Sequence, residues 1–509
     1  MSSLHPVTAG SPVAACAQVA AGRVIGDSST TVHGVTLDSR AVRAGDLYAA
    51  LPGANTHGGS FAASAAAAGA AAVLTDERGQ QLVEQAGVDV PLIVVDDPRA
   101  VLGAVSALVY DTTDLSLELL GITGTNGKTT TAYLLTSALE ALGRTTGLIG
   151  TVETRIGTER VKSERTTPES CDLHRLLAVM RERAVDDCVM EVSSHALALH
   201  RVDGVVYDLA LFTNLSQDHL DFHSDMEDYF RAKSSLFTPQ RAKRGLVCVD
   251  DEWGARLAEA ATIDCVTIGS TQKAGVRPDY EVECEGDDGF VLRGPGDVRL
   301  SLRSALPGDF NIMNTAMAAA ALLMLGHAPE QVRAAVLTDP HVPGRMERVG
   351  VGKDGAPLAV VDYAHTPDAV AAALTALKRP GGGPLVAVLG AGGGRDVGKR
   401  AAMGRAAAIA DVVIVTDDNP RGEDPAQIRA AIVTGAREVA DGGHVEEVGD
   451  RRAAIERAVE IACAAGESAT IALVGKGHET GQEIEGVLHP FDDRVELALA
   501  LRRRLGVSA

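Results

Sequence analysis

Aromatic residues, positive charge and long apolar runs are all scarce in this chain. Phe, Tyr and Trp together make up 3% of its 509 residues, so its cores must be built from Ala, Val, Leu and Ile. Lys and Arg number 47 against 68 Asp and Glu, which gives a formal net charge of -21. This excess of negative charge argues against general nucleic-acid binding and against adhesion to anionic membranes. Local basic sites for phosphate or carboxylate remain compatible with it.

Signals for disulfides, zinc ribbons and export are missing as well. The seven cysteines form no Cys-x-x-Cys pair and are odd in number, which favours reduced thiols in a cytoplasm. No apolar run reaches about 18 residues, the length of a membrane span. A secretory signal begins with a positively charged segment, but this chain has no Lys or Arg before Arg23. We therefore expect a soluble, cytoplasmic protein that neither binds nucleic acid nor enters a membrane.

The remaining composition indicates a large α/β protein. Apolar residues amount to 46% of the chain and glycines number 54, and the length suggests about three domains. We predict an N-terminal α/β domain over 1–116, a central P-loop ATPase-type parallel sheet over 117–340 and a C-terminal Rossmann-like α/β domain over 341–509. Alternation around Gly-rich turns at 280–302 predicts antiparallel hairpins, and the Ala-rich run 62–72 predicts a helix.

The strongest functional signal is the sequence T-G-T-N-G-K-T-T at residues 123–130. It follows the apolar run 115–120 and precedes an amphipathic stretch, and a strand, a glycine turn and a helix N-terminus in that order form a phosphate-binding loop. Lys128 supplies positive charge and a Thr hydroxyl can reach Mg²⁺. The common longer pattern has glycine where this chain has Ile122, and the shorter form is typical of ATP-dependent amide-forming ligases. The alternative is an ordinary Gly/Thr-rich turn.

Further polar residues follow predicted strands in the middle of the chain. Glu191 ends an apolar run and is a natural Mg²⁺ ligand, although a strand-end carboxylate can also cap a helix. His219 and His223 lie four residues apart, which suggests zinc, but the metalloprotease pattern requires Glu where the chain has Leu220. We therefore predict a second magnesium beside the phosphates with His219 contributing, and an exposed, structural His223. Lys233 by itself is typical of a solvated helix face.

The last third of the chain carries a second set of polar strand ends. Arg345 could reach a γ-phosphate and Asp362 could bind ribose hydroxyls, with an interdomain ion pair as the alternative for each. The glycine string at 390–394 breaks the G-x-G-x-x-G spacing, which excludes a nicotinamide site. The segments 417–421 and 475–479, together with the arginine after the glycine string, combine guanidinium groups with a carboxylate. Such a set suits a small zwitterion.

Together these motifs resemble the Mur ligases, in the same order and over essentially the whole chain. The N-terminal segments 37–40, 45–48 and 53–58 match the uridine-nucleotide domain of that family. The resemblance implies an ATP-dependent ligase of cytoplasmic peptidoglycan precursor synthesis. In that reaction the D-glutamyl γ-carboxylate of a UDP-linked muramoyl dipeptide becomes an acyl phosphate and is then joined to meso-diaminopimelate. The Asp-Asn-Pro-Arg form at 418–421 favours diaminopimelate over lysine.

The resemblance assigns residues to five roles. Those expected to bind ATP are Gly124, Thr125, Asn126, Gly127, Lys128, Thr129, Thr130, Asn311, Arg345 and Asp362. Those expected to bind the UDP-linked dipeptide are Leu37, Ser39, Ala54, Asn55, Thr56, Thr166, Thr167, Ser193 and Arg201. Those expected to bind diaminopimelate are Arg395, Asp418, Asn419, Pro420, Arg421, Gly475 and Glu479. Mg²⁺ is expected at Thr129, Glu191, His219 and Lys233, and catalysis is assigned to Lys128, Lys233, Glu191 and His219.

In the family, the residue that matches Lys233 is carbamylated and helps to bind magnesium. An ordinary lysine has a pKa of about 10.4, and nearby positive charge disfavours its ammonium form. The neutral amine can take up CO₂ and become an anionic carbamate. Three departures from the family pattern occur: Leu199 replaces a substrate-contacting Gln, Gly394 replaces an Asp, and one residue fewer separates Arg395 from Asp418.

Two other functions share parts of this pattern. A folylpolyglutamate synthase has the nucleotide loop and the lysine but would not be expected to carry the segments 37–40 and 418–421. A nucleotide-dependent regulatory switch would leave the arginines and the carboxylate of the last third without a role.

Overall fold

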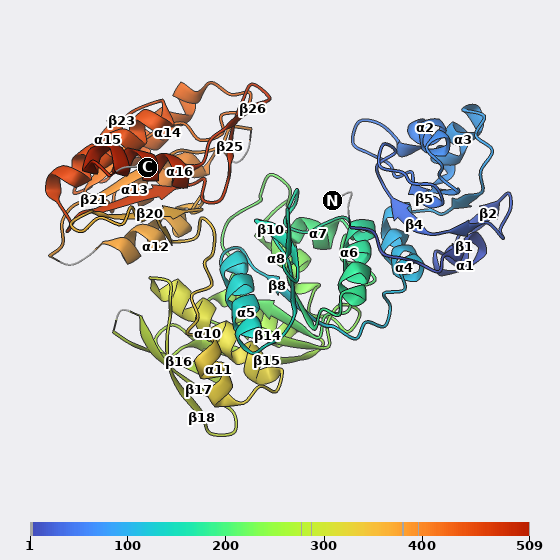
Figure 1. The fold of residues 1–509 in the computed structure, drawn as a ribbon, viewed down its shortest axis with the longest axis horizontal. Helices are drawn as coiled ribbons and strands as arrows, with labels where there is room; N and C mark the ends of the chain where they lie inside the picture. The colour runs from blue at the N-terminus through green and yellow to red at the C-terminus, as the bar shows by residue number, and fades with distance from the viewer. Residues whose placement is uncertain (1–3, 276, 287, 379–380, 395–396, 508–509) are drawn as a thin grey trace.

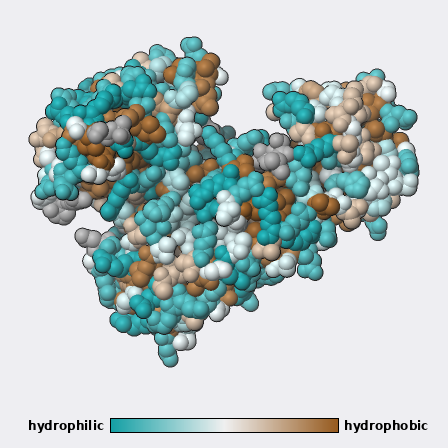
Figure 2. Space-filling view, viewed as in Figure 1, coloured by the Kyte–Doolittle hydropathy of each residue, from teal (hydrophilic) through white to brown (hydrophobic). Residues whose placement is uncertain are grey.

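The computed structural model describes residues 4–275, 277–286, 288–378, 381–394 and 397–507. Its three lobes follow one another along the chain, and the N-terminal and C-terminal lobes lie on either side of the central one (Figure 1). The space-filling view shows a wide notch between the two outer lobes above the central lobe, on a mostly hydrophilic face (Figure 2). Within the described residues, no helix is both long and apolar enough to cross a bilayer.

The N-terminal lobe contains a five-stranded sheet in the order β2-β7-β6-β5-β4, parallel except for the β2–β7 pair. Its elements are β1 (Ser11–Pro12), α1 (Val13–Val19), β2 (Arg23–Ile25), β3 (Thr31–Val32), β4 (Gly34–Thr36), β5 (Asp46–Ala49), a short 3-10 helix (Gly58–Phe61), α2 (Ala62–Ala67), β6 (Ala72–Thr75), α3 (Glu77–Gln85), β7 (Leu92–Val94) and α4 (Pro98–Tyr110). The helix expected over 62–72 ends early, because Gly69 adopts φ 106 and the chain then enters β6.

The central lobe is built on one 11-stranded sheet within the described residues, in the order β11-β10-β9-β12-β8-β13-β14-β15-β16-β17-β18. Its strands are β8 (Glu118–Thr123), β9 (Thr146–Ile149), β10 (Glu153–Ile156), β11 (Glu159–Lys162), β12 (Asp187–Glu191), β13 (Leu209–Phe212), β14 (Arg244–Cys248), β15 (Asp264–Ser270), β16 (Tyr280–Glu285), β17 (Gly289–Gly294) and β18 (Val298–Arg303). In this order, neighbouring strands from β9 through β12 and β8 to β16 pair in parallel, whereas β10 and β11 at one edge pair antiparallel. At the other edge β16–β18 form the antiparallel hairpins expected from the sequence.

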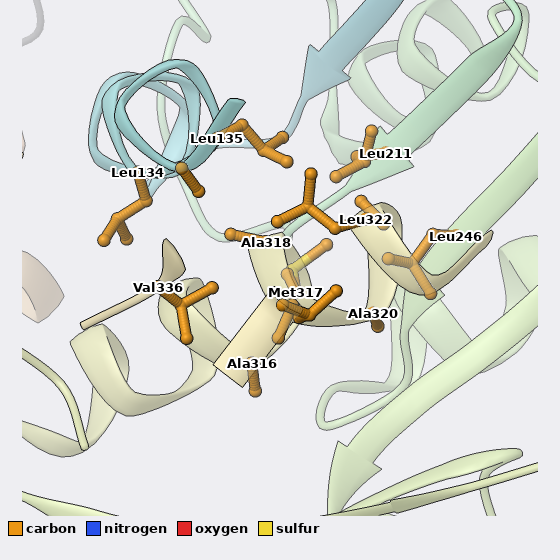
Figure 3. Close-up of a cluster of buried hydrophobic side chains, with 14 of the residues drawn as sticks. Leu134, Leu135, Leu211, Leu246, Ala316, Met317, Ala318, Ala320, Leu322 and Val336 are labelled. Carbon is orange, nitrogen blue, oxygen red and sulfur yellow. The ribbon is translucent and has the colours of Figure 1, made fainter. Parts of the chain in front are cut away.

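The helices of the central lobe bury small side chains. They are α5 (Lys128–Ala141), α6 (Ser170–Glu182), α7 (Ser194–Ala198), α8 (Met226–Ser234), α9 (Glu252–Ala260), α10 (Asp309–Met324) and α11 (Pro329–Ala335). Figure 3 shows Ala318 and Leu322 of α10 on the side that faces Leu134 and Leu135 of α5. Alanines let these helices approach closely, which is how a chain poor in aromatics fills its core.

The strand that leads to the phosphate loop lies later than the apolar run suggested. The run 115–120 predicted the strand, but β8 starts at Glu118 and includes Gly121 and Ile122. Pairing with β12 and β13 on both sides extends the strand to Thr123. The turn itself therefore begins at Gly124.

The C-terminal lobe carries a six-stranded sheet in the order β19-β20-β24-β21-β22-β23, parallel except for β19. Its elements are β19 (Glu347–Arg348), β20 (Leu358–Asp362), α12 (Pro367–Leu377), β21 (Leu385–Leu389), α13 (Lys399–Ala407), β22 (Val412–Val415), α14 (Pro425–Arg437), β23 (His444–Glu447), α15 (Arg451–Ala465), β24 (Thr470–Val474), the hairpin β25 (Gly481–Ile484) and β26 (Val487–Pro490), and α16 (Asp493–Leu505). Since carboxyl ends of parallel strands share one edge, the predicted site residues gather there.

A fully buried ion pair joins the first turns of α15 and α16. Arg451 Nη2 lies 2.6 Å from Asp493 Oδ2, and neither side chain is exposed. The same guanidinium donates to the carbonyl oxygens of Asp417 and Val474, at 3.4 and 3.3 Å. Val474 is the last residue of β24 and Asp417 lies two residues after β22, so the pair supports the loops that follow these strands.

We expect Asp493→Ala to lower the free energy of unfolding of the C-terminal lobe by about 3–5 kcal/mol, because it leaves the Arg451 charge buried and unpaired. Urea unfolding of the whole chain measures this loss, with cleavage of the C-terminal lobe by a protease as the signal that this lobe has unfolded. The matched control is Glu496→Ala, which removes an ion pair to the half-exposed Arg452 between the same helices and should cost about 1 kcal/mol or less. Equal losses in the two variants would contradict the prediction.

Candidate active site

The phosphate loop is fixed from the neighbouring strand β13. Gly124 adopts φ 145, and a side chain there would place its Cβ 1.9 Å from Thr213 Oγ1. Asn214 accepts the backbone N–H of Thr125 with its carbonyl oxygen at 2.8 Å and that of Asn126 with its side chain at 3.0 Å. The loop therefore requires glycine at its first position and is held in shape without any ligand.

Two lysine side chains, one half-buried and one fully buried, share one carbonyl oxygen in this loop. Lys128 Nζ donates to Gly124 O at 2.8 Å, and Lys233 Nζ donates to the same oxygen at 2.7 Å. Lys233 is 1% exposed, so the solvated helix face that its sequence context suggested is wrong. Burial lowers the pKa of Lys233 well below its ordinary value, and the positive charge of Lys128 lowers it further, against the opposing effect of Asp218. Lys233 is therefore driven toward its neutral amine next to Lys128.

Glu191 lies at the end of β12 directly across from the loop. Its carboxylate is buried, and Thr129 Oγ1 donates to it at 2.9 Å. Thr151 donates to it as well, from its backbone N–H at 2.8 Å and from its hydroxyl at 3.0 Å. Arg345 of the C-terminal lobe donates to Thr129 Oγ1 at 3.2 Å. A carboxylate, a hydroxyl and a guanidinium from two lobes thus converge beside Lys128.

Of the two histidines near the loop, His223 is buried, contrary to expectation, whereas the side chain of His219 is partly exposed. His223 was expected to be exposed but is 2% exposed, because its Nε2 lies 2.9 Å from Ser194 Oγ and its ring packs against Tyr229. Burial lowers the pKa of His219 to about 4, so its ring is neutral at physiological pH. The His219 ring packs edge-on against His195. Among the described residues, no group of three or more His, Cys, Asp and Glu is arranged to hold a metal ion.

A cavity of about 430 Å³ extends from the loop to the C-terminal lobe. Its lining includes Asn126, Gly127, Thr130, Asn314, Met317, Arg345 and Asp362. Asn311 is not among the lining residues: it is buried behind Asn314, whose side-chain amide donates to it at 3.1 Å. Both oxygens of Asp362 accept backbone N–H groups, from Met346 and Ala364. Burial raises the pKa of the Asp362 carboxyl, against the opposing charge of Arg345.

A larger cavity of about 1090 Å³ lies between the N-terminal and central lobes. Leu37 and Ser39 line it, as do Gly53 and Gly58. The predicted residues Ala54, Asn55 and Thr56 lie on the exposed stretch between those glycines. The wall from the central lobe includes Arg165, Glu169 and Arg175.

The other residues expected to bind the UDP-linked dipeptide gather between Glu191 and this wall. Thr167 Oγ1 donates to Glu191 O at 2.9 Å and accepts the backbone N–H of Ser193 at 3.0 Å. Thr166 Oγ1 lies 3.0 Å from Thr151 Oγ1. Arg201 Nε lies 3.0 Å from the Glu169 carboxylate. These contacts place the group next to the phosphate loop.

The polar strand ends of the C-terminal lobe form a connected network. Asn419 Nδ2 donates to Glu479 at 2.8 Å, and Asn419 Oδ1 accepts the backbone N–H of Glu483 at 2.9 Å. Arg421 Nη1 donates to Gly393 O at 2.6 Å, and its Nε pairs with Glu483 at 3.2 Å. Asp418 and Gly475 are adjacent at the ends of β22 and β24, since a Cβ on Gly475 would lie 2.8 Å from Asp418 Oδ2. Pro420 lies between Asn419 and Arg421, and Arg395 falls outside the described residues.

The sequence analysis missed three residues of these sites. Lys476 is fully buried, and its Nζ lies 3.2 Å from Glu479 and 3.6 Å from Asp418. Asn314 faces the smaller cavity, and Asp218 lies 4.0 Å from His365 of the C-terminal lobe. Lys476 stands in the strand-end segment 475–479, so its position was a signal that could have identified it. Nothing local to Asn314 or Asp218 distinguishes them.

Three family models match the chain in succession. They are the Mur ligase family, catalytic domain, over residues 31–110, the Mur ligase middle domain over 122–322, and the Mur ligase, glutamate ligase domain, over 344–500. The matches confirm the resemblance drawn from the motifs.

Relatives with a shared name span nearly the whole chain. The UDP-N-acetylmuramoyl-L-alanyl-D-glutamate--2,6-diaminopimelate ligase of Streptomyces avermitilis is 50% identical over 494 residues, 95% of each chain. The protein of that name from Streptomyces coelicolor is 51% identical over 486 residues, 94% of each chain. A solved structure of a ligase of that name matches with a TM-score of 0.66 at 30% identity, covering 97% of this chain and 99% of that one. On this combined similarity in sequence and fold, the chain belongs to the Mur ligase family, whose members are ATP-dependent ligases.

Proposed function

We propose that this ligase joins meso-2,6-diaminopimelate to UDP-N-acetylmuramoyl-L-alanyl-D-glutamate in the cytoplasm, acting as a monomer, with ATP converted to ADP and phosphate. The observation that carries the proposal is the meeting of two lobes at the phosphate loop, where Arg345 contacts Thr129 beside Lys128 and Glu191. The names of the relatives supply the identity of the substrates. We assign binding of the UDP-linked dipeptide to the domain 1–116, binding of ATP to 117–340 and binding of diaminopimelate to 341–509.

The chemistry requires anions to be brought together. A γ-carboxylate oxygen of the dipeptide attacks the terminal phosphorus of ATP, the bond to ADP breaks, and an acyl phosphate forms. The amine of the diamino acid then attacks the acyl carbon, and phosphate leaves with the bonding electrons while the amine loses a proton. Lys128 and Arg345 offset the charge that accumulates between carboxylate and triphosphate. Closure of the lobes excludes water from the acyl phosphate.

Glu191 and Thr129 fit a divalent cation only as part of a ligand set that phosphate oxygens complete, because no group of three His, Cys, Asp and Glu is arranged around one position among the described residues. Glu191 offers a buried carboxylate, Thr129 a hydroxyl and His219 a neutral ring, and hard cations prefer oxygen ligands. Mg²⁺ bound to them would neutralise phosphate charge. Lys233 can join this set only as an anion.

We propose that Lys233 is carbamylated. Its buried amine has a lowered pKa and is therefore neutral more readily than an exposed lysine. The nitrogen lone pair attacks the carbon of CO₂, an N–C bond forms, one C=O bond opens to an oxyanion, and the nitrogen releases a proton. The product carries a negative charge next to Lys128, where the unmodified ammonium would meet like charge.

The network at the strand ends of the C-terminal lobe fits a zwitterionic amino acid. Asn419, Lys476 and Glu479 are already connected by hydrogen bonds, which orients Glu479 toward an ammonium group. Arg421 supplies a guanidinium fork for a carboxylate. We assign Asp418, Pro420, Gly475 and Arg395 to the same pocket.

We expect phosphate release from ATP to require both the UDP-linked dipeptide and the diamino acid. A phosphate-release assay over meso-diaminopimelate, its stereoisomers and L-lysine, with the dipeptide substrate fixed, tests this requirement. Turnover should be fastest with meso-diaminopimelate. Phosphate release with neither substrate would indicate a nucleotide switch, and preference for L-lysine would indicate the lysine-adding variant.

Lys233→Ala should lose nearly all activity, because it removes both the buried amine and the carbamate formed on it. Bicarbonate should not restore turnover, whereas small carboxylic acids that fill the space should restore part of it. The matched control is Lys243→Ala, since Lys243 is 64% exposed and pairs only with surface Asp208 among the described contacts. Near-normal turnover by the Lys233 variant would refute the assignment.

Arg421→Ala should raise the KM for diaminopimelate by at least about tenfold, because one charge-assisted contact to the carboxylate is lost. The KM for ATP should change little. Steady-state kinetics with each substrate varied in turn separates the two effects. Equal increases in both constants would remove Arg421 from the amino-acid pocket.

A further inference from the structure

Three arginines surround a single carboxylate at the border of the N-terminal and central lobes. Glu169 precedes α6, and its side chain is 10% exposed. Its oxygens lie 3.2 Å from Arg99 Nη1, 3.4 Å from Arg165 Nη1 and 3.0 Å from Arg201 Nε. Arg99 belongs to α4 of the N-terminal lobe, which packs beside α6 of the central lobe (Figure 1). The cluster therefore spans the lobe border.

The cluster carries more positive than negative charge. One carboxylate faces three guanidinium groups, and burial together with the charges of Arg165 and Arg99 lowers the pKa of Arg201 despite Glu169. Elsewhere along the same cavity Asp38 pairs with Arg40 and Asp172 pairs with Arg175, while Asp46 accepts the backbone N–H of Arg43. The exposed Glu164 can offset one charge at most.

This surplus faces a cavity large enough for a nucleotide-linked substrate. Arg99, Arg165 and Glu169 all line the 1090 Å³ cavity that Leu37 and Ser39 border on the other lobe. Arg99 and Arg165 are 30% and 55% exposed, so their guanidinium groups can reach a ligand in the cavity. Arg99 also lies 3.5 Å from the carbonyl oxygen of Leu199, which ties it across the lobe border.

We propose that Arg99 and Arg165 bind anionic oxygens of the UDP-linked substrate, and that Glu169 holds both side chains at the cavity wall until the substrate replaces it. This inference rests on the proposed function and adds two binding residues to it. Phosphate and carboxylate oxygens share the required chemistry, because a guanidinium fork binds either in the same geometry. Since Arg99 comes from the N-terminal lobe, the bound anion would also hold the two lobes together.

Isothermal titration with UDP-N-acetylmuramoyl-L-alanyl-D-glutamate, UDP and UMP tests the proposal. Arg99→Ala and Arg165→Ala should each raise the Kd of the full substrate roughly tenfold, with melting temperatures and the KM for ATP unchanged. Arg165→Ala keeps the test decisive if Arg99→Ala does not fold, because Arg165 is the more exposed. The matched control is Arg303→Ala, because Arg303 of β18 is 70% exposed and pairs with Asp288. The Kd of this variant for the full substrate should equal that of the wild type.

The titrations with UDP and UMP identify which anionic group of the substrate the two arginines bind. A weaker Kd for UDP in the variants assigns the arginines to the diphosphate, and a loss confined to the dipeptide-bearing substrate assigns them to a carboxylate; either result supports the proposal. Wild-type Kd in both variants, in an enzyme that binds and turns over the substrate, would overturn this inference alone. A wild-type enzyme that fails to bind the UDP-linked dipeptide would overturn the proposed function as well.

Discussion

The shared carbonyl of Gly124 is the interaction on which the active site depends. Lys128 and Lys233 approach it from two different helices, with Lys233 fully buried and Lys128 half-buried. Two like charges so close together are costly unless one is lost or an anion compensates them. The lowered pKa of Lys233 favours its neutral amine beside the charge of Lys128. The glycine is required because Thr213 leaves no room for a side chain.

Close packing also positions the residues of the two lobes around the loop. Alanine-rich α10 packs closely enough on α5 to bring Asn314 to within contact of Gly127. On the other side, Arg345 crosses from the C-terminal lobe to Thr129, with its guanidinium 4.5 Å from the centre of the Tyr363 ring. These contacts align strand ends from two separate sheets on one phosphate site, which a single sheet edge could not do.

The amino-acid pocket depends on buried charged side chains that hold its loops from the inside of the lobe. The buried Arg451–Asp493 pair binds the carbonyl oxygens directly before Asp418 and Gly475. Lys476, also fully buried, then connects Asp418 and Glu479. A pocket built from carboxylates and an amide keeps its geometry because cations from adjacent strands and helices satisfy each oxygen.

Local sequence patterns predicted most helices and strands and the motifs at their ends, although β8 begins later and α2 ends earlier than expected. The glycine loop at 123–130, the strand end at Glu191 and the Asp-Asn-Pro-Arg segment follow from neighbouring residues, because periodicity and turn chemistry act over a few positions. The tertiary structure alone decided which distant groups meet. The burial of His223 and Lys233, the hydrogen bond from Arg345 to Thr129, and the approach of Arg99 and Arg201 to Glu169 depend on residues that are far apart in the chain. Such contacts depend on how whole lobes pack, and no local pattern encodes that packing.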